Sequence, residues 1–266
     1  GSSFDVKAAS LYSVALHMES TGYTIGVSNP KTGELIGLEQ YEITEDSKRS
    51  ESHSVLQSNH LLHILNHSSQ TTIYTTTSKF VIIPSIFYDV KHINELHRNI
   101  FEIDSSESLF SKFIPEIDSH IIFPIESSLK DNLQNQIGHI DFNHHFASLI
   151  STYHLYYASE SENSIYLQFH SKAFTLCLFK NKEMTLFNIF EFNSAADIIY
   201  YTYYSMEQFN FSTADTPIHI GGQSVYKEDV LATLQRFTSK IFNLKPDHLT
   251  QLNQTSADAL INTIFD

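Results

Sequence analysis

Histidine is the residue type in this chain whose number and spacing best suit metal binding or proton transfer, because there are fifteen of them. The densest group is His139, Asp141, His144 and His145. If this stretch is helical, Asp141 and His145 stand four residues apart and could share a metal ion. The Glu of a His-Glu-x-x-His hydrolase motif is missing from it. We therefore favour surface histidines here and predict no metal site.

A second group of histidines is His53, His60, His63 and His67. The last three have the i, i+3, i+7 spacing of one helix face, which could hold a metal ion or respond to pH. Surface histidines are again the favoured interpretation.

Motifs for nucleophilic or nucleotide chemistry are missing from the sequence. It has no Gly-x-Ser-x-Gly elbow, no Gly-x-x-x-x-Gly-Lys-Ser/Thr loop and no Gly-x-Gly-x-x-Gly fingerprint. Cys177 is the one cysteine and lies in an apolar run, where a thiol is buried and inert. We predict no catalytic nucleophile and no disulfide framework.

The composition and charge balance exclude several classes of function. Apolar residues make up 41% of the chain, as in globular proteins, and the net charge of −14 disfavours nucleic-acid binding. The N-terminal residues lack the basic and apolar regions of a signal peptide. The apolar runs are far shorter than the roughly 20 residues that cross a bilayer. We predict a soluble cytoplasmic protein without nucleic-acid partners or membrane insertion.

The elements that must position any site form two similar series. The first forty residues are predicted to form three antiparallel strands, because turn signals lie at 19–22 and 29–33. The further elements expected in this half are a helix ending near Asn66, strand segments at 71–76 and 80–84 (a pair or one interrupted strand), a helix at 86–101, a polar connection over 104–118, a strand at 120–125 and helical stretches over 127–157.

The second half repeats this order of elements. The predicted elements are strands at 164–169, 173–179 and 184–192, a helix capped by Ser194, a strand at 217–220 and a helix through Leu231, Leu234, Phe237 and Ile241. Each half thus reads β-β-β-α-β, and equivalent strands are about 150 residues apart. Such repetition predicts an α/β protein with two lobes and mixed sheets.

The duplicated order resembles the actin, sugar kinase and heat-shock chaperone superfamily. The segment Pro217-Ile218-His219-Ile220-Gly221-Gly222-Gln223-Ser224 is similar to its adenosine motif, in which an apolar strand ends in Gly-Gly. The resemblance implies an actin-like ATPase fold with ribonuclease H-like lobes at 1–140 and 141–266, and an interlobe helix at about 141–157. The small chain further resembles bacterial assembly proteins of pilus and secretion machines, and more specifically an uncharacterised bacterial family of unknown function.

The phosphate-binding turns that the resemblance implies are degenerate. In the superfamily each lobe carries an Asp-x-Gly turn, where the Asp serves magnesium and water and the Gly lets backbone N–H groups reach phosphate. In the first lobe Glu19 replaces the Asp and Thr21 the Gly; in the second lobe Gln168 and His170 do so. An amide binds magnesium weakly and is no base at neutral pH. We therefore assign no catalytic residue.

The glycine pair allows two interpretations. A strand-to-helix turn often needs Gly for its positive φ, so the pair can be structural. Alternatively, Gly221, Gly222 and Gln223 let a nucleotide pass close to the backbone without being hydrolysed. Lys172 beside the second turn could meet a phosphate, although a solvated lysine is the favoured interpretation.

Tyrosines crowd two of the predicted helices. They are Tyr153, Tyr156 and Tyr157 in one helix and Tyr200, Tyr201, Tyr203 and Tyr204 in the other. Packing of these helices between the lobes is favoured, while a partner surface or self-association stays open.

These patterns together predict a pseudo-ATPase that acts as an interaction or scaffold module. It would need no cofactor, and its acidic charge favours a basic surface on a protein partner. The alternative is an active or nucleotide-sensing ATPase that binds ATP with Mg²⁺ through Glu19 and a second acid, Asp141 or Glu191. A third hypothesis is a pocket for an acyl or nucleoside ligand at Gly221 and Gly222.

Overall fold

The computed structural model describes residues 6–19, 22–42, 59–102, 104–137, 139–157, 162–170, 173–222 and 224–244. The chain divides into two compact units, the first reaching Leu149 and the second starting at Ile150. None of the helices in these ranges combines the length and the apolar character that a membrane crossing requires.

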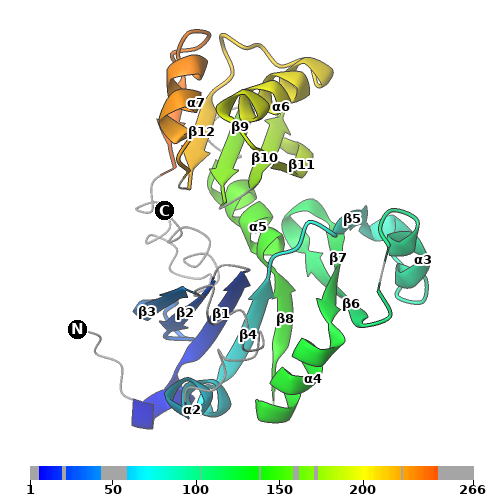
Figure 1. Cartoon of the computed structure of the whole chain (residues 1–266), viewed down its shortest axis with the longest axis vertical. Coiled ribbons are helices and arrows are strands. Elements are labelled where there is room, and N and C mark those ends of the chain that lie inside the picture. Colours follow the sequence, from blue (N-terminus) through cyan, green and yellow to red (C-terminus); the bar gives the residue numbers. More distant parts are fainter. Residues whose placement is uncertain are drawn as a thin grey trace. The chain divides into compact units, whose positions relative to one another are not determined.

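The first unit is built on a five-stranded sheet with the order β3-β2-β1-β4-β8 (Figure 1). Its strands are β1 (Ser13–Glu19), β2 (Gly22–Ser28), β3 (Leu35–Glu42), β4 (Gln70–Thr75) and β8 (Asp141–His144). The first three strands are antiparallel, as predicted, whereas β4 is parallel to both β1 and β8. The first unit also contains two short helical segments, a 3₁₀ helix η1 (Val6–Leu11) and α2 (Asn59–His67).

A second, three-stranded sheet of the first unit corrects several predictions. Its order is β5-β7-β6, and its elements are β5 (Val81–Pro84), η3 (Ser85–Phe87), α3 (Ile93–Arg98), β6 (Glu107–Ile114), η4 (Pro115–Ile117), β7 (Ser119–Glu126) and the following α4 (Ser127–Gln136). The segments 71–76 and 80–84 thus belong to different sheets. The helix predicted over 86–101 is a 3₁₀ turn and two helical turns, and the supposed polar connection contains β6.

The prediction of a single helix over 141–157 was wrong for the first four residues. Residues Asp141–His144 form β8, and α5 begins at His145 and ends at Tyr157. The change from strand to helix is stabilised by side chains, because Asn143 Oδ1 accepts the N–H of His144 and His144 Nδ1 accepts the N–H of Phe146. These bonds satisfy donors that the start of a helix leaves without backbone partners.

The second unit repeats the order of the first. Its elements are β9 (Asn163–Phe169), β10 (Ala173–Lys180), β11 (Glu183–Glu191), α6 (Ala195–Gln208), β12 (Ile218–Gly221), α7 (Lys227–Leu234) and β13 (Ile241–Asn243), in the sheet order β11-β10-β9-β12-β13. Ser194 caps α6 through a capping box with Asp197, as its position predicted. The last predicted helix is too long, because it ends at Leu234 and Ile241 starts a strand parallel to β12.

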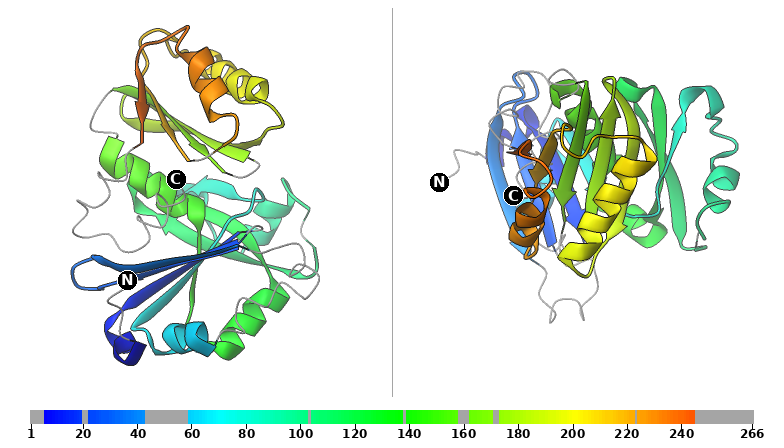
Figure 2. Two further views of the ribbon diagram at one scale, coloured as in Figure 1. Left: turned by 60° about the vertical axis from the view of Figure 1, so that its left-hand side comes forward. Right: turned by 90° about the horizontal axis from the view of Figure 1, so that it is seen from above.

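Alternate residues of the second sheet face two different environments. Ile165, Leu167 and Phe169 of β9 face the core that α6 and α7 cover (Figure 2). On the other face, Tyr166 lies between His219 at 4.8 Å and Tyr153 at 4.9 Å, measured between ring centroids. Cys177 is opposite Tyr166 and fully buried, and this burial raises the pKa of its thiol. The prediction of a buried, inert cysteine is confirmed.

Several buried histidines remain uncharged at neutral pH. Burial lowers the pKa of His144 to about 3 and those of His170 and His219 to about 4, from an ordinary value of 6.5. The charged form of each side chain would lose hydration in the core. These imidazoles therefore act in the folded protein as neutral packing and hydrogen-bonding groups.

We predict that the free energy of unfolding decreases as the pH falls from 6.5 to 4. In this range the unfolded chain binds protons that the folded histidines do not, so each histidine removes up to about 1.4 kcal/mol per pH unit. Urea denaturation at a series of pH values would measure the slope. His219→Phe, which keeps a ring beside Tyr166, should make the slope shallower, while exposed His139→Gln is the control. An unchanged slope in His219→Phe would contradict the assignment.

Candidate functional site

The glycine pair lies at the carboxyl edge of the second sheet, directly against the end of β9. Gly221 is opposite Gln168 in the parallel pair β9–β12. A Cβ on Gly221 would lie 2.2 Å from Gln168 Oε1, and one on Gly222 would lie 2.3 Å from the carbonyl oxygen of Phe169. Gly222 also has φ +75°. The close approach of the Gly221–Gly222 backbone to the end of β9 therefore explains why both residues are glycine.

Groups beside both turns at this edge form hydrogen bonds within the second unit. At the β9–β10 turn, which corresponds to the second phosphate loop, the backbone N–H of His170 donates to the carbonyl oxygen of Ala173 at 2.8 Å. After β12, Lys227 Nζ donates to the carbonyl oxygen of Gly222 at 2.8 Å. These donors are thereby used within the unit. Lys172 and Gln223 lie outside the described residues.

The corresponding edge of the first sheet contains a histidine, His17, that the sequence analysis did not select. Glu19 pairs with Gly22 across a tight connection, in which Thr21 lies outside the described residues. His17 is fully buried, with Nε2 2.8 Å from Thr76 Oγ1 and its ring stacked on that of His145 at 4.5 Å. The only signal for His17 was its position at the end of the apolar run 14–16.

His144 lies at the same edge and has a defined tautomer. Because its Nδ1 accepts the N–H of Phe146, its Nε2 carries the proton and donates to the carbonyl oxygen of Thr77 at 3.1 Å. His144 is fully buried and His145 nearly so. The interpretation of these two residues as surface histidines was wrong. The core accommodates His144 because both of its ring nitrogens have hydrogen-bond partners, and it accommodates His145 as a ring stacked on His17.

The two acids considered as partners of Glu19 lie in different places. Asp141 is in register with Thr72, which is in register with Ala15, so it lies near the amino ends of the parallel strands, four residues below Glu19. It also forms an ion pair with Lys112. Glu191 ends the terminal strand β11, two strands away from β9.

The histidine clusters do not form a metal site with three or more protein ligands in the part of the chain that the structure describes. No group of three or more His, Cys, Asp or Glu side chains there is arranged to hold a metal ion. Asp141 is on a strand, so the spacing from His145 is not that of a helix. In the second cluster, His63 and His67 are exposed and stacked at 4.2 Å, whereas His53 and the side chain of His60 lie outside the described residues.

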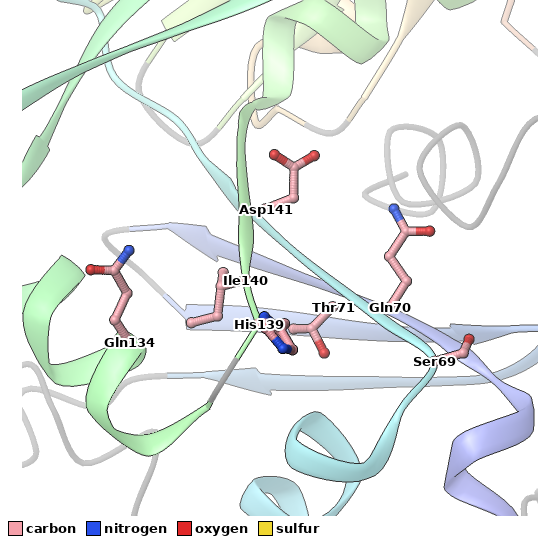
Figure 3. Close-up of a pocket in the computed structure, with 7 residues that line it drawn as sticks. All are labelled: Ser69, Gln70, Thr71, Gln134, His139, Ile140 and Asp141. Atoms are coloured by element: carbon pink, nitrogen blue, oxygen red, sulfur yellow. The ribbon is translucent and has the colours of Figure 1, made fainter.

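His139 and Asp141 instead line a polar pocket of about 430 Å³ in the first unit (Figure 3). The other residues of its wall are Ser69, Gln70, Thr71, Gln134 and Ile140. This pocket lies near the amino ends of β4 and β8, away from the strand ends that carry Glu19 and His144. It is therefore separate from the edge where the resemblance placed phosphate.

The tyrosines divide into buried and exposed members. Tyr153 is buried, Tyr201 stacks on Phe190 at 4.6 Å, and Tyr203 contacts Phe237 at 5.2 Å, all within the second unit. Tyr200 and Tyr204 are 60% and 49% exposed. The side chains of Tyr156 and Tyr157 lie outside the described residues.

Comparison with solved structures identifies the class of protein. A protein of unknown function with an actin-like ATPase fold from Bacteroides thetaiotaomicron VPI-5482 superposes with a TM-score of 0.83 at 19% identity, over 93% of this chain and 98% of the other. The PilM–PilN type IV pilus biogenesis complex gives 0.51 at 10% identity, over 94% and 96%. A filament of AlfA from B. subtilis plasmid pLS32 gives 0.43 at 8% identity, over 94% and 97%. The first of these matches, with its TM-score of 0.83, shows that this chain has the actin-like ATPase fold, as the resemblance implied.

The family follows from the sequence comparison. The chain belongs to the family described as "Protein of unknown function (DUF3822)", whose model matches residues 1–241. No curated protein matches it. The expectation of an uncharacterised family with this fold is confirmed.

We predict that Gly222→Ala destabilises the second unit by about 2–4 kcal/mol, because the new Cβ meets the backbone of Phe169 at a positive φ. Gly221→Ala should cost about 1 kcal/mol, since the Gln168 side chain can rotate away. Gly37→Ala is the matched control, because no atom lies within 4 Å of its new Cβ. Urea denaturation measures all three variants. Equal stability of Gly222→Ala and Gly37→Ala would refute the close approach.

Proposed function

We propose that this protein is a non-catalytic interaction or scaffold module built on the actin-like ATPase fold. Its cellular role would then lie in binding a protein partner, with no cofactor required.

One observation carries the proposal: the described residues at the end of β9 and after β12 make contacts within the protein where phosphate would have to bind. Gly222 lies against the backbone of Phe169, and the His170 N–H donates to Ala173. At the position of the magnesium-binding acid stands Gln168, whose amide packs over Gly221. A neutral amide can neither replace a carboxylate on magnesium nor accept a proton from water at neutral pH.

The positions of the alternative acids agree with this proposal. Asp141 lies toward the opposite ends of the parallel strands from Glu19 and is already paired with Lys112. A protein complex also has a precedent on this fold, because one structural neighbour is the PilM–PilN type IV pilus biogenesis complex. Actin-like architecture is thus compatible with a role in assembly.

The competing function is an ATPase, or a nucleotide sensor, that binds ATP with Mg²⁺. It draws support from the fold and from the retained Gly221–Gly222 turn after β12. In that case Gly221, Gly222 and Gln223 would contact the adenosine, and Glu19 would serve the metal.

We predict no magnesium-dependent heat on titration with ATP and no phosphate release above the buffer rate. Isothermal titration calorimetry with and without Mg²⁺, together with a phosphate-release assay, measures both. Gln168→Asp is the informative variant, because it restores a carboxylate at the position of the magnesium-binding acid. We expect no turnover in this variant, because Gly222 and His170 are unchanged.

Turnover by the unmodified protein that is lost in Glu19→Gln would contradict the scaffold proposal and support the ATPase. Binding without turnover would also contradict the expected result and identify a nucleotide sensor. Gly37→Ala serves as the control for both variants, because its new Cβ meets no neighbouring atom.

A further inference from the structure

Two exposed histidines lie one turn apart on α2 of the first unit. His63 and His67 have the i, i+4 spacing that places side chains next to each other on a helix. Their rings are stacked with centroids 4.2 Å apart and planes inclined by 13°. We define the histidine pair as these two residues alone, because the side chain of His60 lies outside the described residues. The pair presents two imidazoles to solvent from one face of the helix.

A hydrogen bond fixes the proton on one of the two rings. His67 Nδ1 lies 2.8 Å from the carbonyl oxygen of His63, which can only accept, so Nδ1 carries the hydrogen. Nε2 of the neutral ring is then unprotonated. Histidines that bind a metal through one nitrogen usually donate the other N–H to a carbonyl or carboxylate oxygen in this way. His67 therefore already has the tautomer that a metal ligand needs.

The backbone that carries the pair is anchored to the first unit. Ile64 and Leu65 lie between the two histidines in sequence and are buried, with 5% and 2% exposure. After the helix, the N–H and the Oγ of Ser69 both donate to the carbonyl oxygen of Tyr12, at 2.8 and 2.7 Å. Thr71 Oγ1 donates to the carbonyl oxygen of Leu65 at 2.9 Å. A metal ion would therefore have to order only two side chains on a helix that is already in place.

The surroundings of the pair favour one class of cation. The segment 59–70 contains no Lys or Arg, which would repel a metal ion, and no Asp or Glu, which would supply oxygen ligands for Mg²⁺ or Ca²⁺. Imidazole suits Cu²⁺, Ni²⁺ and Zn²⁺, and Cu²⁺ binds most tightly of these. Two metal–nitrogen bonds of about 2.0–2.1 Å span at most about 4 Å. The ring separation of 4.2 Å is close to this span, so small rotations of the side chains bring two nitrogens to one ion.

We propose that the histidine pair is a chelating site for a divalent transition-metal ion, with Cu²⁺ as the ion that it binds most tightly. His67 binds through Nε2, His63 supplies the second nitrogen, and water completes the coordination of the ion. An ion held in this way connects two successive turns of α2 and stabilises the helix. The site takes part in no reaction. It goes beyond the proposed scaffold function and does not depend on it.

Another exposed histidine of the first unit provides a matched control. His92 precedes α3, and its Nδ1 lies 3.0 Å from Asp89 Oδ2, so its ring is also oriented by a hydrogen bond. The residues four positions away on either side are Tyr88 and Leu96, so no second imidazole is available at that spacing. A single imidazole cannot form a chelate, and His92→Gln should leave the site intact.

The test titrates the full chain with Cu²⁺ in a buffer that does not bind copper, and calorimetry measures Kd. We expect one site that binds more tightly than the other histidines do. His63→Gln and His67→Gln should each raise its Kd at least about tenfold, because the second nitrogen acts as an intramolecular ligand. The double variant should raise Kd no further, since either substitution alone breaks the chelate. His92→Gln should bind like the unmodified protein.

Two further measurements examine the same site. Electron paramagnetic resonance at one equivalent of Cu²⁺ counts the nitrogen ligands in the unmodified protein, and we expect two. Zn²⁺ should slow amide hydrogen exchange in α2, because an ion that binds only the folded helix stabilises it. The same ion should leave exchange in α2 of His67→Gln unchanged.

Four results would overturn the inference. They are equal Kd values for the unmodified protein and the double variant, a further loss of affinity in the double variant, an equal loss in His92→Gln, and a resonance spectrum with a single nitrogen ligand. The second of these would show two independent histidines in place of a chelate. Should a variant fail to fold, the spectrum of the unmodified protein still decides the question.

Discussion

The approach of Gly222 to the backbone of Phe169 is the constraint on which the second unit depends. Parallel pairing brings the ends of β9 and β12 to one edge, and the turn into α7 must then pass over β9 without a Cβ. Space that a ligand could use at this edge is filled by the protein itself. Gly222 thus permits the turn, and under the proposed function the same close approach would disfavour phosphate binding.

Neutral polar groups lie at the strand ends of both units, where the first unit also has Glu19. Gln168 and His170 lie at the end of β9, and His17 and His144 lie at that of the first sheet. Burial lowers the pKa of His144 and of His170, so both rings are uncharged at neutral pH, and the His144 ring also forms hydrogen bonds. Exposed carboxylates such as those of Glu191 and Glu207 lie on the surface of the second unit instead.

The sequence predicted the repeated architecture but not the details at its edges. Long apolar strands such as β9 and β10, and the capping residue Ser194, carry strong local signals, so the β-β-β-α-β order was correct in both halves. Short or polar strands were missed: β6 contains Glu107, Ser108, Ser111 and Lys112 among its eight residues, and β8 and β13 have only a few residues each. Burial of His17 and His144 depends on partners distant in sequence, which no local pattern contains. The sequence likewise allowed two interpretations of Gly222, and a structural role in the turn was only one of them.

The buried thiol of Cys177 gives this protein an internal probe of its own opening. It lies on β10 between strands β9 and β11, opposite Tyr166 and Phe187, with no exposed surface and a raised pKa. An alkylating reagent can reach it only while the second sheet is transiently open, because the thiolate is the reactive form. With a single cysteine in the chain, the labelling rate reports the opening of that one unit, without any engineered reporter.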